Sequence, residues 1–170
     1  LKKIVLKEKP KYWDEYETIL PEPFYVNKIK KIKIIKNDYK EILRYPSLLF
    51  KKNYNTRDHF YIFHGSFFIN KAIELLDVKH RSDFSETLNQ NYFSPFNMFV
   101  CKNKEILFNY YEELFSWLFD CEEVFSKKDL TGYGKIRIYG FLAERFASYW
   151  FNKYTKVGVS PIIFFDTHKN

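Results

Sequence analysis

The side chains best suited to acid–base or phosphate chemistry lie in one stretch, RIYGFLAERFASYW, at residues 137–150. Arg137 and Glu144 are seven residues apart, so on an ideal helix they lie only about 20° apart around the axis, with Arg145 one step round. They could form an ion pair at the helix surface, which contributes little stability by itself. Alternatively, Glu144 could accept a proton from an attacking hydroxyl while an arginine binds phosphate. Spacing alone favours the structural pair and leaves the catalytic alternative open.

Asn97 interrupts the apolar run Phe96–Cys101, which predicts a strand covered on both faces. An amide without partners in such a strand costs roughly 1–3 kcal/mol, so its presence needs a reason. Either Asn97 bonds its own neighbouring backbone, or it lines a ligand pocket at a strand end. The sequence leaves these two alternatives open.

Histidine and cysteine positions give no strong catalytic or metal-binding pattern. The four histidines are His59, His64, His80 and His168. Only the first two are close in sequence, and at an odd spacing they would point to opposite faces of a strand. A surface or structural role is therefore favoured for each of them. Both cysteines, Cys101 and Cys121, lie at apolar positions with no metal-ligand spacing around them, which predicts core packing, no metal site and a reducing compartment.

Two long helices are predicted to position these residues. The first begins after a plausible N-cap, Asn103, and carries apolar side chains at three-four spacing to Phe125. The second covers residues 135–153. A shorter helix is predicted at residues 67–76 and a polar one within 77–91, with strands at 18–20, 24–35, 96–101 and 159–165. This order predicts an α/β fold with the long helices laid against a sheet.

Composition and charge narrow the class of protein. A chain of 170 residues suits one domain, residues 1–170, and the 21% aromatic content indicates a folded, aromatic-packed core. The net charge of +7 comes largely from lysines in the first third, which would attract phosphate or anionic lipid; they are Lys28, Lys30, Lys31, Lys33, Lys36 and Lys40. Because these lysines alternate with isoleucines, a solvated edge strand is favoured over an anion site. The lack of a signal peptide or a long apolar run predicts a soluble, cytoplasmic protein.

Three blocks resemble a bacterial family, the domain of unknown function DUF4422, which is associated with capsular polysaccharide and O-antigen biosynthesis and regarded as glycosyltransferases. The blocks are YETILPEPFY (16–25), FNMFVCKNKEILFNYYEELFSWLFDCEEVF (96–125) and RIYGFLAERFASYW (137–150). The second and third are the specific ones. The resemblance covers the family's C-terminal part, because its N-terminal, donor-binding block would precede Leu1. The chain is therefore expected to be a fragment or a shortened version.

The resemblance implies a GT-A-like, Rossmann-like α/β fold that transfers a sugar from a nucleotide-sugar donor to a growing cell-surface polysaccharide, capsule or lipopolysaccharide. Glu144 would be the catalytic base, because the acceptor hydroxyl must lose a proton. Asn97 would orient hydroxyls, Arg137 or Arg145 would stabilise the leaving diphosphate, and His64 would bind on the acceptor side.

Further partners follow from the same resemblance. The acceptor would be a glycan or lipid-linked glycan, and the lysines could hold the enzyme at the inner face of the cell membrane. Where the family usually has an acidic pair after a histidine, this chain has Gly65, Ser66 and Phe67. The resemblance leaves a divalent metal open for the enzyme, but this segment does not support one.

The main alternative is a non-catalytic glycan- or protein-binding remnant domain that lacks the donor site. The enzyme hypothesis predicts that Glu144 and Asn97 face a common cleft. The alternative predicts an exposed aromatic patch, and Glu144 held in a buried pair with an arginine with no open pocket beside it. Nucleic-acid binding is the weakest hypothesis, because no recognised motif accompanies the lysines.

Overall fold

The computed structural model describes residues 8–27, 39–128 and 130–162. The helices are α2 (Tyr39–Arg44), α3 (Thr56–His64), α4 (Ser66–Leu75), α5 (Val78–Thr87), α6 (Lys104–Phe125), α7 (Tyr133–Ile136) and α8 (Ile138–Tyr154), with 3-10 turns η1 (Lys11–Glu15) and η2 (Pro46–Leu49). The strands are β1 (Thr18–Pro21), β2 (Phe24–Tyr25), β3 (Tyr92–Phe93), β4 (Val100–Cys101) and β5 (Val157–Ser160). None of the described helices combines the length and apolar character needed to span a bilayer.

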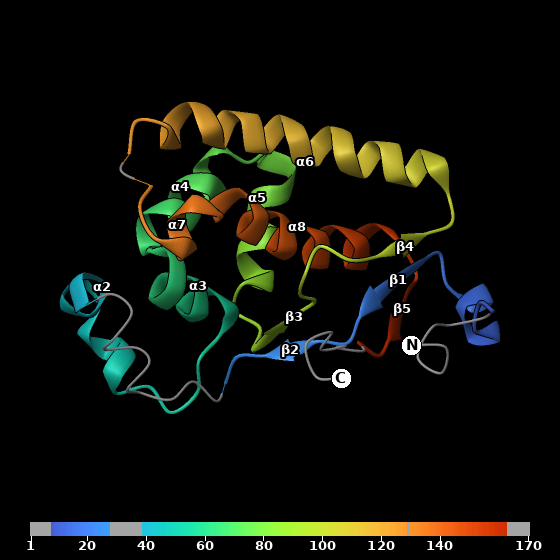
Figure 1. Cartoon of the computed structure of the whole chain (residues 1–170), viewed down its shortest axis with the longest axis horizontal. Coiled ribbons are helices and arrows are strands. Elements are labelled where there is room, and N and C mark those ends of the chain that lie inside the picture. Colours follow the sequence, from blue (N-terminus) through green and yellow to red (C-terminus); the bar gives the residue numbers. More distant parts are fainter. Residues whose placement is uncertain (1–7, 28–38, 129, 163–170) are drawn as a thin grey trace, which may run out of the picture.

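The strands form a small mixed sheet and a separate two-stranded ribbon. In the sheet, β1 lies between β4, which is antiparallel to it, and β5, which is parallel. The ribbon pairs β2 with β3. Figure 1 shows α6 running along the top of the molecule with α8 beneath it and the β1–β5 pair lower down. The α/β prediction is confirmed as a small sheet flanked by helices.

Helix α6 follows the sequence pattern closely. Asn103 caps its first turn by accepting a hydrogen bond from the amide of Glu105. The buried side chains recur every three or four residues, as predicted; they are Tyr110, Leu114, Trp117, Cys121 and Phe125. Cys101, which is partly buried, and Cys121, which is buried, are both free thiols that pack in the core.

Helix α8 is the centre of the core, and this is why its polar residues matter. Phe146 is fully buried, and its ring lies 5.2 Å from that of Trp117 on α6 and 6.2 Å from that of Phe84 on α5. Because neighbours cover α8 on several sides, most of its side chains from Leu142 to Phe151 are buried. Side chains that α8 carries into the site are therefore held by a rigid element.

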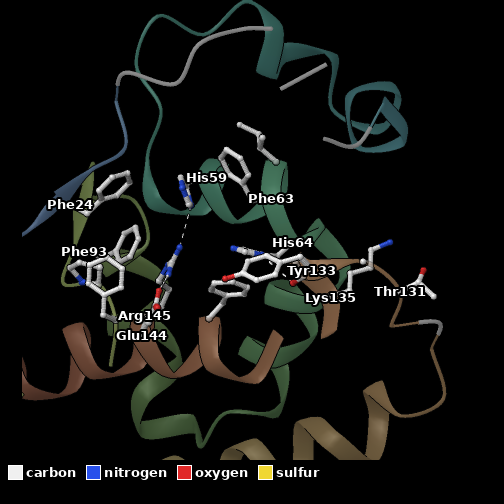
Figure 2. A pocket seen from close by; sticks show the side chains of 16 residues that line it. Phe24, His59, Phe63, His64, Phe93, Thr131, Tyr133, Lys135, Glu144 and Arg145 are labelled. Carbon is white, nitrogen blue, oxygen red and sulfur yellow. Dashed lines mark hydrogen bonds and ion pairs between the residues drawn. The ribbon is translucent and has the colours of Figure 1, made fainter. Parts of the chain in front are cut away.

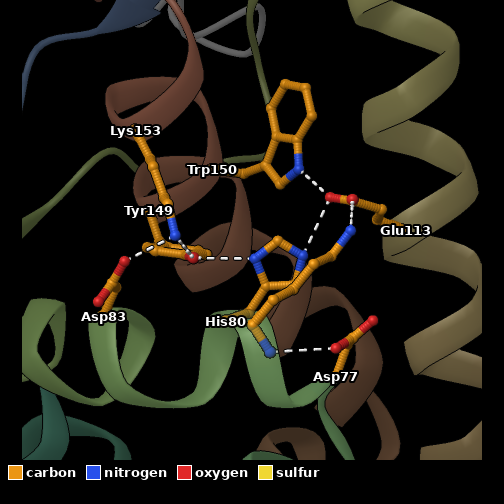
Figure 3. Close-up of polar contacts among 8 residues, drawn as sticks. Asp77, His80, Asp83, Glu113, Tyr149, Trp150 and Lys153 are labelled. Carbon is orange, nitrogen blue, oxygen red and sulfur yellow. Dashed lines mark hydrogen bonds and ion pairs between the residues drawn. The ribbon is translucent and has the colours of Figure 1, made fainter.

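A polar network fixes α5 between α6 and α8 (Figure 3). His80, only 1% exposed, accepts a hydrogen bond at Nδ1 from the Tyr149 hydroxyl at 2.9 Å, and its Nε2 faces Glu113 Oε2 at 3.2 Å. Glu113 also accepts hydrogen bonds from Lys79 and the Trp150 indole. Both ring nitrogens of His80 therefore face side chains that connect the three helices.

The strand predicted at 96–101 is mostly wrong. Phe96 and Asn97 have φ angles of 73° and 50°, in the left-handed region, so they form a turn and only Val100–Cys101 forms a strand. Helix α3, in a segment for which no element was predicted, starts at Thr56 because Asn55 and Asp58 cap each other's backbone amides. Of the strands predicted at 24–35 and 159–165, only β2 and β5 are seen, and residues 28–38 and 163–165 lie outside the described residues.

Candidate functional site

A cavity of about 560 Å³ opens between α3, the ribbon, the loop before α8, and α8 itself. Figure 2 shows how its side chains converge from these elements. Among the described residues, the aromatic rings that line it are Phe24, Phe63, Phe93, Phe96, Tyr133 and Phe141, and the ionisable groups other than that tyrosine are His59, His64, Lys135, Glu144 and Arg145. A largely aromatic wall with a few converging polar groups is typical of a small-molecule site of this size.

Arg145 is the polar centre of this wall. Its side chain is 1% exposed, one guanidinium nitrogen donates to Glu144 Oε2 at 2.7 Å, and the other donates to His59 Nδ1 at 3.2 Å. The guanidinium also lies 3.5 Å from the ring centroid of Phe93. Burial lowers the pKa of Arg145 to about 10, opposed by Glu144, so it stays charged at neutral pH. Its two terminal guanidinium nitrogens bond Glu144 and His59, while Nε is buried without a partner among the described residues. Arg145 therefore positions Glu144 and His59 rather than offering an open anion site.

The two histidines of α3 both line the cavity. Their ring centroids are 6.3 Å apart. His64 stacks on Phe141 at 4.0 Å between centroids and hydrogen-bonds through Nδ1 to the carbonyl of Gly134 at 3.1 Å. Burial, reinforced by the charge of Arg145, lowers the pKa of His64 to about 3 and the pKa of His59 well below its usual value. Both rings are therefore neutral at physiological pH.

The structure brings three of the five proposed site residues to the cavity, namely Glu144, Arg145 and His64. Arg137 does not line it. It is exposed at the start of α8, where its guanidinium donates to the Tyr133 hydroxyl and lies 5.1 Å from that ring's centroid. Since Tyr133 lines the cavity, Arg137 lies just outside its rim.

Asn97 is not among the residues that line the cavity, although its neighbour Phe96 is. Its amide donates to the carbonyl of Gly140 at 3.0 Å, which ties the turn at residues 96–97 to α8. Asn97 thus bonds a backbone carbonyl, as one of the two alternatives predicted, but the carbonyl belongs to a residue 43 positions away and not to a sequence neighbour. The common cleft expected for Glu144 and Asn97 is therefore not formed by their side chains.

Sequence reasoning missed His59 and the role of residues 131–135, a turn that leads into the short helix α7. The capping pair Asn55 and Asp58 is a helix-start signal, and with it the histidines would have been placed on one short helix. No local sequence pattern predicts that residues 131–135 line the cavity, because their approach to α3 depends on tertiary packing.

The arrangement offers a carboxylate held by a buried arginine beside two neutral imidazoles and several aromatic faces. Glu144 is partly buried, with a side chain that is 14% exposed, and its Oε1 has no hydrogen-bond partner among the described residues. In the described part of the chain, no three histidine, cysteine, aspartate or glutamate side chains come together as a metal site would require. The chemistry that these groups support directly is hydrogen bonding and proton transfer.

Comparison with known proteins gives one finding. No curated protein and no solved structure matches the chain. A family model described as "Domain of unknown function (DUF4422)" matches residues 3–156, which is most of the chain. The earlier resemblance, based on three blocks, is thus confirmed over a longer stretch. The chain belongs to the DUF4422 family.

Proposed function

We propose that this chain is the acceptor-side part of a glycosyltransferase that transfers a sugar from a nucleotide-sugar donor to a growing capsule or lipopolysaccharide. The observation that carries the proposal is the position of Glu144 in the wall of an aromatic cavity, with one carboxylate oxygen that no described residue engages. The cavity volume of about 560 Å³ lies in the usual range for small-molecule sites. Family membership supports the same class of enzyme.

In the proposed reaction, an acceptor hydroxyl attacks the anomeric carbon of the donor sugar. The new carbon–oxygen bond forms while the bond to the nucleotide diphosphate breaks, and the diphosphate leaves with that electron pair. Glu144 Oε1 takes the hydroxyl proton, and Arg145 holds Oε2 so that the carboxylate is correctly aimed.

In this proposal, positively charged side chains near the cavity mouth stabilise the leaving diphosphate. Lys135 lines the cavity and Arg137 lies next to Tyr133 at its rim, so both are better placed than the buried Arg145 to meet a diphosphate. In this proposal Arg145 therefore positions the Glu144 carboxylate, and it does not stabilise the leaving diphosphate as the resemblance implied. The donor nucleotide sugar is the only co-substrate proposed, and these residues suggest no protein-held metal.

Several finer features belong to the same proposal. A GT-A-like, Rossmann-like sheet would contain parallel strands, and the parallel β1–β5 pair is compatible with it. We take residues 1–170 as one domain that works in the cytoplasm, near a lipid-linked or other glycan acceptor at the inner membrane face. Nucleic acid is not a proposed partner.

The test is a nucleotide-release assay on the whole gene product. The protein is incubated with UDP-, GDP- and CMP-activated sugars, alone and with glycan acceptors, and the freed nucleotide is measured. Release that depends on an acceptor supports the proposal. No release with any donor above that of a heat-denatured sample would contradict it.

A second candidate, a non-catalytic binding or assembly domain, is favoured by an aromatic stripe on the outer face of α6. Phe108 is 72% exposed and Phe119 is 63% exposed, with Tyr111 and Phe115 between them. The buried pair of Glu144 with an arginine also fits this candidate, but the cavity beside Glu144 does not. Sugar binding without any transfer would favour it over the enzyme.

A further inference from the structure

Hydrogen bonds fix the two cavity histidines in opposite tautomers. A guanidinium can only donate, so His59 Nδ1, which contacts Arg145, must be an acceptor and the ring proton lies on Nε2. A carbonyl can only accept, so His64 Nδ1, which contacts Gly134, must carry the proton and Nε2 keeps its lone pair. One ring therefore has a free N–H and the other has a free acceptor.

These two Nε2 atoms are available to a ligand. Both rings line the cavity, and in each the Nδ1 atom is already engaged. Among the described residues, the buried side-chain polar atoms without a partner include neither of these Nε2 atoms, so neither is sealed from solvent. The ring centroids are 6.3 Å apart, a separation on the scale of one sugar ring, whose hydroxyls would each form a hydrogen bond of about 2.9 Å.

The surroundings select against an anion at this position. Among the described residues that line the cavity, the buried cation Arg145 is paired with Glu144, and both histidines are neutral. A phosphate or carboxylate placed here would face the lone pair of His64 Nε2 and the carboxylate of Glu144. The nearest wall is aromatic, with Phe63 at 4.6 Å from His59 and Phe141 at 4.0 Å from His64 between ring centroids.

We propose that His59 and His64 form a donor–acceptor pair that recognises a hydroxyl of an uncharged sugar ring, with His59 as a specificity-determining residue. The inference rests on the proposed function for the class of ligand, but its geometry does not depend on catalysis. Hydroxyls suit both partners, because a hydroxyl can accept from His59 Nε2–H and can donate to His64 Nε2. Arg145 sets the His59 tautomer, and the loop at Gly134 sets that of His64.

The first measurement is a long-range proton–nitrogen NMR spectrum of the imidazoles at about pH 7, which reports the tautomer of each ring. We expect the Nε2–H form for His59 and the Nδ1–H form for His64. The same form in both rings, or a charged ring at this pH, would overturn the proposal. No variant is needed, so failure to fold cannot confuse the result.

The second measurement adds a ligand to the same sample. Methyl α-glucopyranoside, methyl α-galactopyranoside and methyl α-mannopyranoside are titrated separately, with inorganic phosphate as the charged probe. We expect at least one glycoside to shift the Nε2 signals of His59 and His64 but not that of His80, whose Nε2 faces Glu113 in the core. Phosphate should leave the pair unshifted.

Variants then separate recognition from catalysis. His59→Phe and His64→Phe should each weaken binding of that glycoside by about tenfold or more, since each leaves one hydroxyl interaction unmade. No shift with any of the three glycosides, or a shift of the pair by phosphate, would refute the inference. Sugar binding without nucleotide release would instead refute only the transferase, so the two failures are distinguishable.

Discussion

Arg145 links two polar groups of the site, Glu144 and His59, from within a helix whose other side chains are mostly apolar. It is buried, stacked on Phe93, and bonded to both Glu144 and His59. A buried charge of this kind is tolerated only when its partners compensate for lost hydration. The carboxylate and the imidazole are therefore held in place by the same guanidinium.

Replacing this arginine should cost stability as well as orientation. Arg145→Met leaves Glu144 partly buried without its partner, so we expect the free energy of unfolding to fall by about 3–5 kcal/mol. Urea unfolding measures it. The matched control is Arg137→Met, an exposed arginine whose loss should cost under about 1 kcal/mol. An equal decrease in unfolding free energy for the two variants would show that the buried network around Arg145 does not stabilise the fold more than a surface arginine does.

Individual site residues were predictable only in part. Glu144 and Arg145 were singled out because charges interrupt an apolar helix face, and the structure places them together at the cavity. Asn97 was proposed as a site residue because its amide interrupts an apolar run, but in the structure this amide bonds the carbonyl of Gly140. Asn97 lies in a left-handed turn, which the sequence pattern does not predict. The sequence does not identify His59 as a site residue, because no helix was predicted for its segment.

Among the elements, residues 131–135, which include the first turn of α7, are held against α3 at very short range. A Cβ atom built on Gly134 would overlap the backbone oxygen of Phe63, closer than real Cβ contacts come. Only glycine allows this approach, which brings Tyr133 and Lys135 to the cavity and lets the Gly134 carbonyl bond His64.

Gly134→Ala should therefore push the loop away from α3. We expect a loss of about 1–3 kcal/mol in unfolding free energy and a loss of the fixed His64 tautomer, because its carbonyl partner moves. Gly140→Ala is the matched control. A Cβ there meets nothing within 4 Å and the residue is inside α8, so alanine should be neutral or stabilise by up to about 1 kcal/mol. If both variants kept the His64 signal unchanged, the tight loop contact would be disproved.

The elements best predicted from sequence are those with long apolar periodicity. The spacing in α6 and α8 identified both helices and most of their buried faces, because a stripe of several turns is hard to mistake. The short strands were predicted less well. Only two residues form β4, and the parallel pairing of β1 with β5 joins segments far apart in the chain. Local patterns contain no information on such pairing.

At the scale of the whole molecule, three neutral histidines are built into the folded state. His59, His64 and His80 all have pKa values lowered mainly by burial, and Glu113 only partly opposes this at His80. The unfolded chain takes up protons at these residues below about pH 6.5, whereas the folded chain does not. Acidification should therefore favour unfolding.

We expect the free energy of unfolding to fall as the pH decreases below about 6.5, by up to about 1.4 kcal/mol per pH unit for each neutral histidine. For His64 the loss should continue toward the folded-state pKa of about 3. Denaturant unfolding at a series of pH values measures this slope. The variant His64→Gln should reduce the slope by about one proton, and an unchanged slope would show that His64 is already protonated in the folded protein.

The central claim, that Glu144 removes the acceptor proton, is tested most directly by nucleotide release from Glu144→Gln in the whole gene product. Glutamine keeps an oxygen that can accept from Arg145 but cannot take a proton, so the account predicts a loss of about 100-fold or more in kcat/KM. Glu123→Gln, an exposed change on α6, is the control and should retain full activity. A thermal melt of each variant checks folding. Activity of a well-folded Glu144→Gln within a few-fold of the unaltered protein would contradict the account.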